Sequence, residues 1–511
     1  MKKIFLILFL GSILLASCSE EFLDTKSLTD LSNDNFWVSE ADAELGIAGC
    51  YDALQDNYLF NGDPWGGSVA GRWDYMSDNG WCRWKWMAGG AVERGENNSS
   101  SWITGDFWRG CYKAIGRCNL VIQNVGKMGT DVIDQDAKDQ IIAEAKFVRA
   151  LVYNYLTMTF EDVPLVTTVQ DPAEANVTKS SKEDIVAFIL KDLGDCVEDL
   201  AAPGTTNFGR ATRGAGYALL ARINLYNENW NDAIIAADKV LAEGYSLHPN
   251  YKALFSTANE MSNEVIFSVR FLRGPDEDGA KFAGYWSGVG LMNYQEALPN
   301  LGETYFCTDG RPIDVSPLYN PAVPSTDRDA RFDGTLVSIG SIYNDAAPPM
   351  QKVWTKYAQR KYTEEGAPTE NHFDANEDFY VFRLGHVILM KAEAIAESGG
   401  TATDVFTEIN KLRPRANMPG MDQTEVDTYF GGDLVEAVRH ERRVETAFEG
   451  LRYLDLKRWK IMEERVEYYN ANDRVDNRMS IRTFAPKNYV WPIPQFEIDV
   501  NTALVQHELW Q

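Results

Sequence analysis

Apolar positions recur at helical spacing along most of this chain. Segments whose apolar residues fall at i, i+3, i+4 and i+7 predict amphipathic helices. They cover residues 41–54, 104–125, 136–159, 182–200, 378–398, 403–412, 433–449 and 451–470. Gly399-Gly400 and Gly431-Gly432 separate the later segments, and Pro414 and Pro419 help to end the helix that runs to Leu412. The pattern therefore predicts a mainly α-helical protein.

Residues 214–245 carry the most informative helical pattern, which predicts two helices joined by a short turn. Tyr217, Leu220, Ala221 and Ala233 fall at the spacing of the tetratricopeptide repeat, whereas Asn224 stands where that repeat has tyrosine. A generic helical hairpin has a similar apolar rhythm, so one match leaves both interpretations open. Helix pairs of either kind bury a shared core by stacking on one another.

The middle of the chain has a different pattern. Between residues 261 and 377 glycine and proline become frequent, and short apolar runs such as residues 265–271 are typical of small strands. We therefore expect tetratricopeptide-like helical pairs that form a scaffold, with an irregular, loop-rich subdomain containing short strands. The predicted regions are 18–260, with a tryptophan-rich loop at 65–103, then the irregular subdomain 261–377, and a C-terminal region 378–511.

The N-terminus has the features of an export signal. Lys2 and Lys3 precede an apolar run from Ile4 to Leu15, which is shorter than the about 20 residues needed to cross a bilayer. Residues 1–17 are therefore predicted to be a signal peptide. Cys18 follows Leu-Ala-Ser, which resembles a bacterial lipobox, so Cys18 is the predicted lipid anchor; an ordinary signal peptide with a chance cysteine is the alternative. The acidic pair Glu20-Glu21 resembles a signal that sends some Gram-negative lipoproteins to the outer face.

Composition limits the kinds of partner, metal site and disulfide that we expect. The net charge of −26 argues against nucleic acid as a partner. The five histidines are isolated, and Val444 stands where a second zinc ligand would follow His440-Glu441, so no metal site is expected. An acidic turn at residues 276–279 offers oxygen ligands for calcium, but its spacing is not that of an EF-hand, and no cofactor is expected. The remaining cysteines lack C-x-x-C spacing and are predicted to be buried free thiols: Cys50, Cys82, Cys111, Cys118, Cys196 and Cys307.

Half of the fourteen tryptophans fall between residues 65 and 108: Trp65, Trp73, Trp81, Trp84, Trp86, Trp102 and Trp108. In this segment rings alternate with charges, amides and glycines, a mixture that suits ligands with apolar faces and hydroxyl edges. Sugars are the commonest ligands of that kind. The competing interpretation is that several rings only attach a long loop to the body of the protein. Trp108 lies on a periodic helix with Tyr112 and Ile115 and is assigned to the core, and Trp102 is expected to pack at the start of that helix.

The predicted glycan contacts centre on Trp81, Trp84 and Trp86. If residues 83–86 are extended, the rings of Trp84 and Trp86 point to one side and form a flat platform. Tyr285 and Trp286 in the irregular subdomain are expected to face them across a groove. The full set of predicted glycan-binding residues is Trp73, Tyr75, Asp78, Asn79, Trp81, Arg83, Trp84, Trp86, Tyr285 and Trp286.

Several motifs together resemble the SusD/RagB family of outer-membrane lipoproteins. The most specific are residues 439–459 (RHERRVETAFEGLRYLDLKRW) and 489–501 (YVWPIPQFEIDVN). Residues 143–151, 160–165, 382–394 and 409–416 are also similar to that family, with Lys146 where arginine is usual. The resemblance implies tetratricopeptide-like helix pairs and non-catalytic binding of oligosaccharide or polysaccharide at the cell surface. It also implies a role as a lid on a SusC-like TonB-dependent transporter in the outer membrane.

Two other functions remain open at the level of sequence. A glycoside hydrolase needs two carboxylates about 5 to 10 Å apart, and Asp74, Asp78, Glu93, Glu96 and Asp106 are the candidates. A helical-repeat adaptor would use the tryptophan cluster to bind only protein or peptide. The carboxylates near Glu441 are expected to be structural, because arginines three and four residues away hold them ionised. No enzyme activity is expected.

Overall fold

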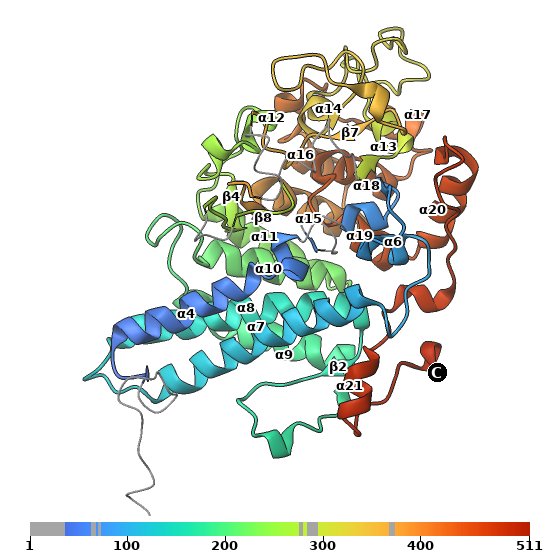
Figure 1. Ribbon diagram of the computed structural model, residues 1–511. Coiled ribbons are helices and arrows are strands. Elements are labelled where there is room, and N and C mark those ends of the chain that lie inside the picture. Colours follow the sequence, from blue (N-terminus) through green and yellow to red (C-terminus); the bar gives the residue numbers. More distant parts are fainter. Residues whose placement is uncertain (1–35, 63–67, 70–72, 275–278, 284–294, 367–373) are drawn as a thin grey trace, which may run out of the picture.

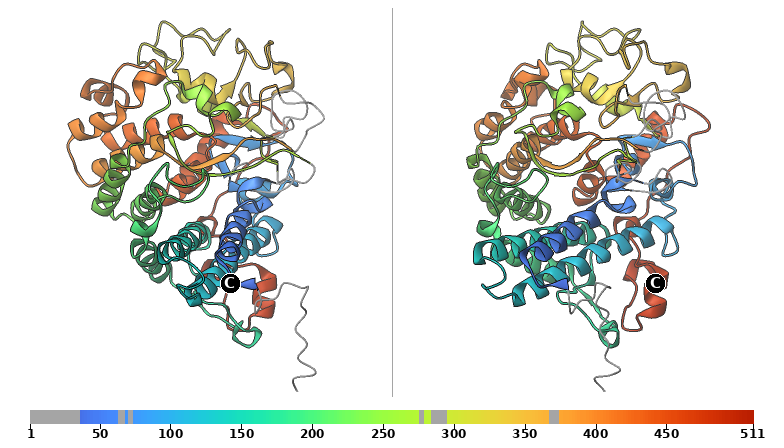
Figure 2. Two further views of the ribbon diagram at one scale, coloured as in Figure 1. Left: turned by 90° about the vertical axis from the view of Figure 1, so that its left-hand side faces the viewer. Right: turned by 60° about the vertical axis from the view of Figure 1, so that its left-hand side comes forward.

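A computed structural model of the protein describes residues 36–62, 68–69, 73–274, 279–283, 295–366 and 374–511. The predicted signal peptide and Cys18 lie outside these ranges. Long helices form the base of the molecule, and the irregular middle of the chain lies at the opposite end (Figure 1). Figure 2 shows the same separation from two further directions.

The base is built from helices that lie side by side. α4 (Glu40–Leu54) packs on α7 (Trp102–Lys127), α7 on α8 (Gln135–Phe160), and α8 on α9 (Lys182–Gly194) (Figure 1). Three of these helices begin at a side-chain cap: Ser39, Asp134 and Ser181 accept a hydrogen bond from a backbone amide in the first turn. Trp108 of α7 is buried in the core, as predicted.

The predicted hairpin at residues 214–245 is confirmed as α10 (Arg213–Tyr226) and α11 (Trp230–Ala242). Ala233 is buried where the two helices meet. Asn224, the departure from the repeat pattern, donates to the Leu220 carbonyl (3.0 Å) and accepts from the Asn229 side chain (3.3 Å). Its amide therefore has polar partners in a place where the repeat has a tyrosine ring.

A further group of helices covers α11. α15 (Leu384–Glu397) packs on α11, and α16 (Ala402–Ile409) and α18 (Leu434–Thr446) pack on α15. The shorter α17 (Gln423–Tyr429), α19 (Arg452–Arg458), α20 (Met462–Tyr468) and α21 (Gln495–Val500) complete the C-terminal region. Pairs of helices thus stack through both ends of the chain, as the periodicity predicts.

Three predicted helices differ from the structure. Residues 378–398 begin as a strand, β8 (Phe379–Arg383), because a short buried run of aromatic and β-branched residues has no periodicity that separates strand from helix. Residues 451–470 divide into α19 and α20 at Lys460, whose φ of 58° is left-handed. The helix predicted for 182–200 ends at Gly194 and is followed by a 3-10 turn at Val197–Asp199.

The irregular subdomain is confirmed as short elements. Its helices are α13 (Pro299–Thr304) and α14 (Ala330–Thr335), and α12 (Tyr251–Leu254) precedes it along the chain. β6 (Leu336–Val337) pairs with β7 (Ala358–Gln359), and β4 (Val265–Val269) pairs with β8, both antiparallel. β2 (Val163–Pro164) and β3 (Lys179–Ser180) form a separate antiparallel pair outside the subdomain. β5 (Gln295–Ala297) pairs with β1 (Gly80–Cys82), so the tryptophan-rich segment is hydrogen-bonded to the subdomain.

The charged motif on α18 is structural, as expected. Glu445 lies between Arg383 (2.7 Å), Arg415 (2.5 Å) and Arg331 (3.1 Å), and all four side chains are almost completely buried. Burial alone would raise the pKa of Glu445, but the three guanidiniums hold the pKa far below its usual range. A carboxylate in this setting stays ionised and has no proton to donate at neutral pH.

Two further features concern the cysteines and the arrangement of metal-binding side chains within the described ranges. The six cysteines at Cys50, Cys82, Cys111, Cys118, Cys196 and Cys307 are buried free thiols, as predicted. Over the same ranges no group of histidine, cysteine and acidic side chains is arranged to hold a metal ion. The acidic turn considered for calcium spans residues 276–279, of which only Gly279 is described.

Candidate functional site

The tryptophan-rich segment divides into a buried part and an exposed part. Trp73 has no exposed surface and Trp81 is also buried, whereas Trp84 is 38% exposed and Trp86 is 53% exposed. We call Trp84 and Trp86 the tryptophan pair. A ring can stack on a sugar only where its face reaches solvent, so the tryptophan pair is the part of the segment that can bind one.

Trp73 belongs to the core. Its ring lies between Phe107, Tyr155, Tyr453 and Trp491, with centroid separations of 5.3 to 6.1 Å. Tyr75, two residues further on, is also buried, and its hydroxyl donates to the Gln359 side chain. Their prediction as glycan contacts is therefore wrong: neighbouring aromatic rings occupy the faces that a sugar would need.

Asp78 and Asn79 are also buried and do not contact solvent. Asp78 pairs with Arg452 (2.8 Å), Arg465 (2.8 Å) and Arg443 (3.4 Å). Burial alone would raise the pKa of Asp78, but the three guanidiniums hold the pKa well below its usual value. Asn79 donates to the carboxylate of Asp74 (2.8 Å). Their prediction as direct glycan contacts is wrong, because both side chains are buried and bind other buried side chains of the protein.

Trp81 and Arg83 connect the segment to a residue that sequence reasoning missed. The Trp81 ring stacks on Trp354 at 5.5 Å, and the guanidiniums of Arg83 and Arg478 lie 4.2 Å and 3.2 Å from the Trp354 centroid. Arg83 also donates to Glu296 (2.5 Å). Trp81 is wrong as a direct contact because it is buried, while Arg83 lies at the boundary with solvent.

No signal in the sequence identifies Trp354, which is a single tryptophan in a proline-rich and glycine-rich region far along the chain. It is placed beside the segment by the pairing of β1 with β5 and by two backbone hydrogen bonds. The amides of Trp354 (2.7 Å) and Thr355 (2.8 Å) donate to the Glu296 carboxylate on β5.

The tryptophan pair sits on a turn, so residues 83–86 are not extended and the condition for a flat platform is not met. The Met87 amide donates to the Trp84 carbonyl (3.1 Å), which closes the turn. The two rings nevertheless lie next to each other, with centroids 6.5 Å apart and planes tilted by 40°. They form an angled pair of rings on the surface in place of a flat platform.

The backbone is held just before the turn and within it. Glu93 of α6 (Ala88–Glu93) accepts from the Cys82 amide (3.1 Å) and pairs with Arg482 (2.7 Å). Arg94 donates to the Lys85 carbonyl between the two tryptophans (2.9 Å). Because the backbone before Trp84 and between the two rings is hydrogen-bonded to buried charged side chains, the rings are presented at a defined place.

Other predicted residues have clear positions. Trp102, at the start of α7, is 39% exposed and lies edge-on to Tyr58 at 6.4 Å, so it packs at the helix start as expected. Tyr285 and Trp286 lie outside the described residues, and their role as glycan contacts stays a prediction.

The five carboxylates considered for hydrolysis all have other partners. Asp74 accepts from the backbone amides of Phe448 (2.9 Å) and Gly450 (2.8 Å), and burial raises its pKa to about 6. Asp78 and Glu93 are ion-paired in the interior. Glu96 pairs with Arg94 (2.7 Å) and Asp106 with Arg109 (2.5 Å). None of these contacts brings two of the five carboxylates together across an open cleft.

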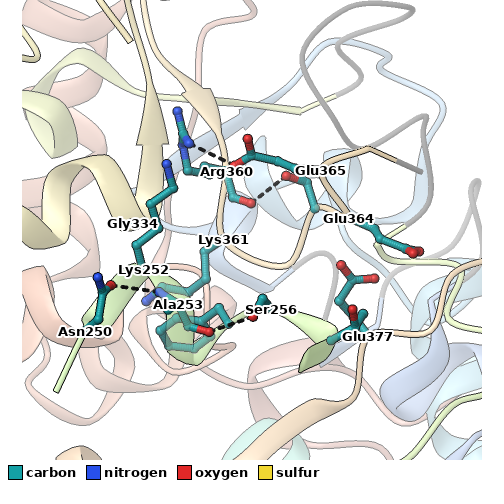
Figure 3. A pocket seen from close by; sticks show the side chains of 13 residues that line it. Asn250, Lys252, Ala253, Ser256, Gly334, Arg360, Lys361, Glu364, Glu365 and Glu377 are labelled. Carbon is teal, nitrogen blue, oxygen red and sulfur yellow. Dashed lines mark hydrogen bonds and ion pairs between the residues drawn. The ribbon is translucent and has the colours of Figure 1, made fainter. Parts of the chain in front are cut away.

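A separate pocket of about 340 Å³ lies beside α12 and the segment that follows β7 (Figure 3). At its floor the buried Lys361 donates to the Tyr251 hydroxyl (2.6 Å) and to Glu449 (2.7 Å). Burial and the charge of Glu364 raise the pKa of Glu377 well above its usual value. Phe255 is the only aromatic side chain among the described residues that line this pocket, and Lys361 lies 4.5 Å from its ring centre. The tryptophan pair offers a sugar much more ring surface.

Comparisons with known proteins cover nearly the whole chain. A sequence model described as the SusD family matches residues 263–510, and one described as starch-binding associating with outer membrane matches residues 21–225. A SusD-like protein of Formosa agariphila is 27% identical over 96% of this chain and 95% of its own length. The starch-binding protein SusD of Bacteroides thetaiotaomicron is 25% identical over 72% of each chain.

Solved structures agree with the sequence comparison. A SusD-like carbohydrate-binding protein of Bacteroides fragilis superimposes with a TM-score of 0.80 and 28% identity, and the match covers 92% of this chain and all of that one. The likeness spans the helical base, the irregular subdomain and the C-terminal region together. In the part of the chain that the structure describes, none of the helices has both the length and the apolar composition needed to cross a membrane.

Proposed function

Because this chain belongs to the SusD/RagB family, we propose that it binds oligosaccharides at the cell surface without cleaving them. It delivers them to a SusC-like TonB-dependent transporter in the outer membrane. The family supports glycan binding and association with the outer membrane as general properties. The identity of the binding residues, the lipid anchor and the transporter partner are the parts that we propose beyond these general properties.

One observation carries the binding site: the exposed tryptophan pair stands on a turn whose backbone is hydrogen-bonded at Cys82 and Lys85 to buried charged side chains. Exposed aromatic rings bind pyranose C–H faces, and their affinity improves when little conformational freedom is lost on binding. The similarity to a starch-binding relative and to a carbohydrate-binding structure supports the same class of ligand.

We propose a non-catalytic function because the acidic residues near the rings are ion-paired with arginines. A glycosidase needs one carboxyl that keeps its proton and a second that is ionised, both facing the sugar. Asp78 is ionised but enclosed by three arginines, and Glu93 is buried against Arg482. Their partners give them a structural role.

Membrane attachment is proposed to depend on Cys18. A lipid on this residue would anchor an otherwise polar protein with net charge −26 to the outer membrane. Replacing Cys18 with Ala is expected to move the protein from the membrane fraction to the soluble fraction. Retention of the variant in the membrane would contradict the lipid anchor.

The binding experiment is a screen of purified protein against a broad panel of neutral and charged oligosaccharides. We expect saturable binding to at least one glycan with no appearance of reducing ends during incubation. New reducing ends would show hydrolysis. Failure to bind any saccharide, together with uptake of a peptide or a protein, would favour the adaptor.

The transporter is tested by purifying the lipidated protein from its own outer membrane in mild detergent. A TonB-dependent transporter is expected to copurify. Its absence from preparations that retain glycan binding would contradict delivery while leaving the binding proposal intact.

A further inference from the structure

A second pocket, of about 460 Å³, lies among the C-terminal helices. We call it the arginine pocket. It is lined by residues of α18, α19 and α20 and by single residues from the ends of α13 and α17. The lining residues are Thr304, Phe430, Glu436, Arg439, His440, Arg443, Arg452, Trp459, Ile461, Glu464 and Arg465.

Four arginines from three helices converge on this pocket. Arg439 and Arg443 lie one turn apart on α18 and so share a face of that helix. Arg452 begins α19, and Arg465 lies on α20. Although the chain has a net charge of −26, this one pocket gathers four guanidiniums in its lining.

Each of the four arginines lies within 4 Å of a carboxylate, but only two of these acids, Glu436 and Glu464, line the pocket. Glu436 pairs with Arg439 (2.9 Å), and Glu464 is 3.9 Å from Arg465. Glu397, which is not a lining residue, also pairs with Arg439 (3.1 Å).

Behind the wall, the single carboxylate of Asp78 is shared by Arg443, Arg452 and Arg465. Asp473 lies further behind, where it accepts from the Asn300 amide (3.0 Å). Burial lowers the pKa of His440 to about 4, so this ring adds no charge at neutral pH. The lining itself therefore has four positive charges and two negative ones.

Two of the arginines keep donors for a ligand. Arg452 uses Nε and one terminal nitrogen to hold Asp78, and Arg465 uses Nε. Within the described ranges, the other terminal nitrogen of Arg452 and both of Arg465 have no hydrogen-bond acceptor. Planar guanidiniums with free N–H groups are well suited to carboxylate and sulfate oxygens.

The surroundings of Arg443 disfavour its positive charge. Burial lowers the pKa of Arg443 to about 9, and the charges of Arg452 and Arg465 act in the same direction against the opposing charge of Asp78. A negative group in the pocket would offset this crowding.

We propose that the arginine pocket binds the carboxylate or sulfate group of an acidic saccharide. Phe430 and Trp459 provide aromatic surface on the walls, and the volume is that of a small-ligand site. This inference rests on glycan binding as the proposed function but places an additional, charge-selective subsite away from the tryptophan pair. Asp78, which pairs with three of the pocket arginines, and the tryptophan pair belong to the same short segment of the chain.

The test is calorimetric titration of the intact protein with glucuronate, glucose 6-sulfate, glucose and inorganic sulfate at low ionic strength. We expect the two acidic sugars to bind about tenfold or more tightly than glucose and inorganic sulfate. Raising the salt to about 0.5 M should weaken their binding, because ions screen the partly exposed arginines.

Variants locate the binding. Arg465→Gln is expected to weaken glucuronate binding about fivefold or more, and Glu464→Gln to strengthen it about twofold, since one removes a cation and the other a rim anion. The Glu464 side chain is 72% exposed, so its substitution does not threaten folding. Arg213→Gln is the matched control, because Arg213 is a partly exposed helical arginine that pairs with two glutamates elsewhere.

Each outcome decides the inference. Glucuronate binding that is no tighter than that of glucose, or that is unchanged in both Arg465→Gln and Glu464→Gln, would overturn it. Equal binding of inorganic sulfate would show an anion site without saccharide selectivity and would also overturn it. If neutral oligosaccharides bind at the tryptophan pair while glucuronate does not, only this inference fails. Glucuronate binding that depends on Arg465, without any binding of neutral glycans, would leave the inference standing and contradict the tryptophan site.

Discussion

Trp73 and Trp84 belong to the same short segment, yet one lies in the core and the other on the surface. The sequence shows that rings alternate with polar residues but does not show which rings meet partners. Trp73 is buried by Phe107, Tyr155, Tyr453 and Trp491, which come from distant parts of the chain. Burial of a ring is set by such tertiary contacts, so the exposed pair could be predicted only as part of a larger group.

Replacing Trp84 with Ala is expected to weaken glycan binding about tenfold or more, or about 1.4 kcal/mol. The side chain is partly exposed, so the melting temperature should change little. Isothermal titration and thermal unfolding of the same preparation measure the two effects. Trp102→Ala is the matched control, since Trp102 is 39% exposed on another element. A large loss of stability in Trp84→Ala would show that the ring is part of the core.

For Asp78 we expect a substitution to affect stability, whereas for Trp84 we expect it to affect glycan binding. Asp78→Asn should reduce the free energy of unfolding by about 3 to 5 kcal/mol, because it leaves three buried or partly buried guanidiniums without their shared carboxylate. Urea denaturation measures this change. Full stability combined with lost glycan binding would instead support the original prediction that Asp78 contacts the sugar.

At the scale of elements, long amphipathic helices are predictable and short buried strands are not. α7 and α8 have clear periodicity over many turns. β8 has four apolar residues followed by Arg383, a pattern that fits the start of a helix equally well, and its strand conformation depends on pairing with β4. The pairing of β1 with β5 likewise joins segments far apart in sequence, and this pairing places Trp354 next to Trp81.

A substitution at Gly80 tests how closely β1 packs against the Tyr75 ring. A methyl group at this position would lie 2.3 Å from the Tyr75 ring, so Gly80→Ala is expected to destabilise the protein by about 1 to 3 kcal/mol. Gly116→Ala on α7 is the control, because nothing lies within 4 Å of the added methyl and alanine favours a helix. Equal free energies of unfolding for the two variants, measured by urea denaturation, would show that the Tyr75 ring can move aside without destabilising the protein.

At the scale of the whole molecule, three sets of buried groups give stability an unusual dependence on pH. Among the carboxyls whose pKa values are raised by burial, five have large shifts: Asp74, Asp378 and Asp473 at about 6, Glu260 at about 7, and Glu377 well above its usual value. As pH falls, the folded state takes up these protons before the unfolded chain does, so stability increases until the unfolded carboxyls also titrate, near about pH 4.

Two other sets oppose that increase. Burial lowers the pKa values of His386 and His440 to about 4, so stability is lost as the unfolded histidines gain protons below about pH 6.5. Arginines hold the pKa values of Asp78, Glu445 and Glu449 below their usual range against the effect of burial, with Lys361 and His386 contributing at Glu449. The stability from these acids is present above about pH 4 and is lost below it.

Because the raised acids outnumber the histidines, the melting temperature is expected to rise modestly from about pH 7.5 to about pH 5 and to fall steeply below about pH 3.5. Differential scanning calorimetry across this range measures it. Glu377→Gln should reduce the rise between neutral and mildly acidic pH. A melting temperature that falls steadily from neutral pH would contradict this balance of groups.

The central claim is that the tryptophan pair binds glycan on a folded, non-catalytic protein. Its most direct test is calorimetric titration of the wild-type protein and of the Trp84→Ala, Trp86→Ala double variant with an oligosaccharide identified in the panel screen. We predict saturable binding by the wild-type protein, no measurable binding by the double variant, and nearly equal melting temperatures. Undiminished binding by a fully folded double variant would contradict the claim.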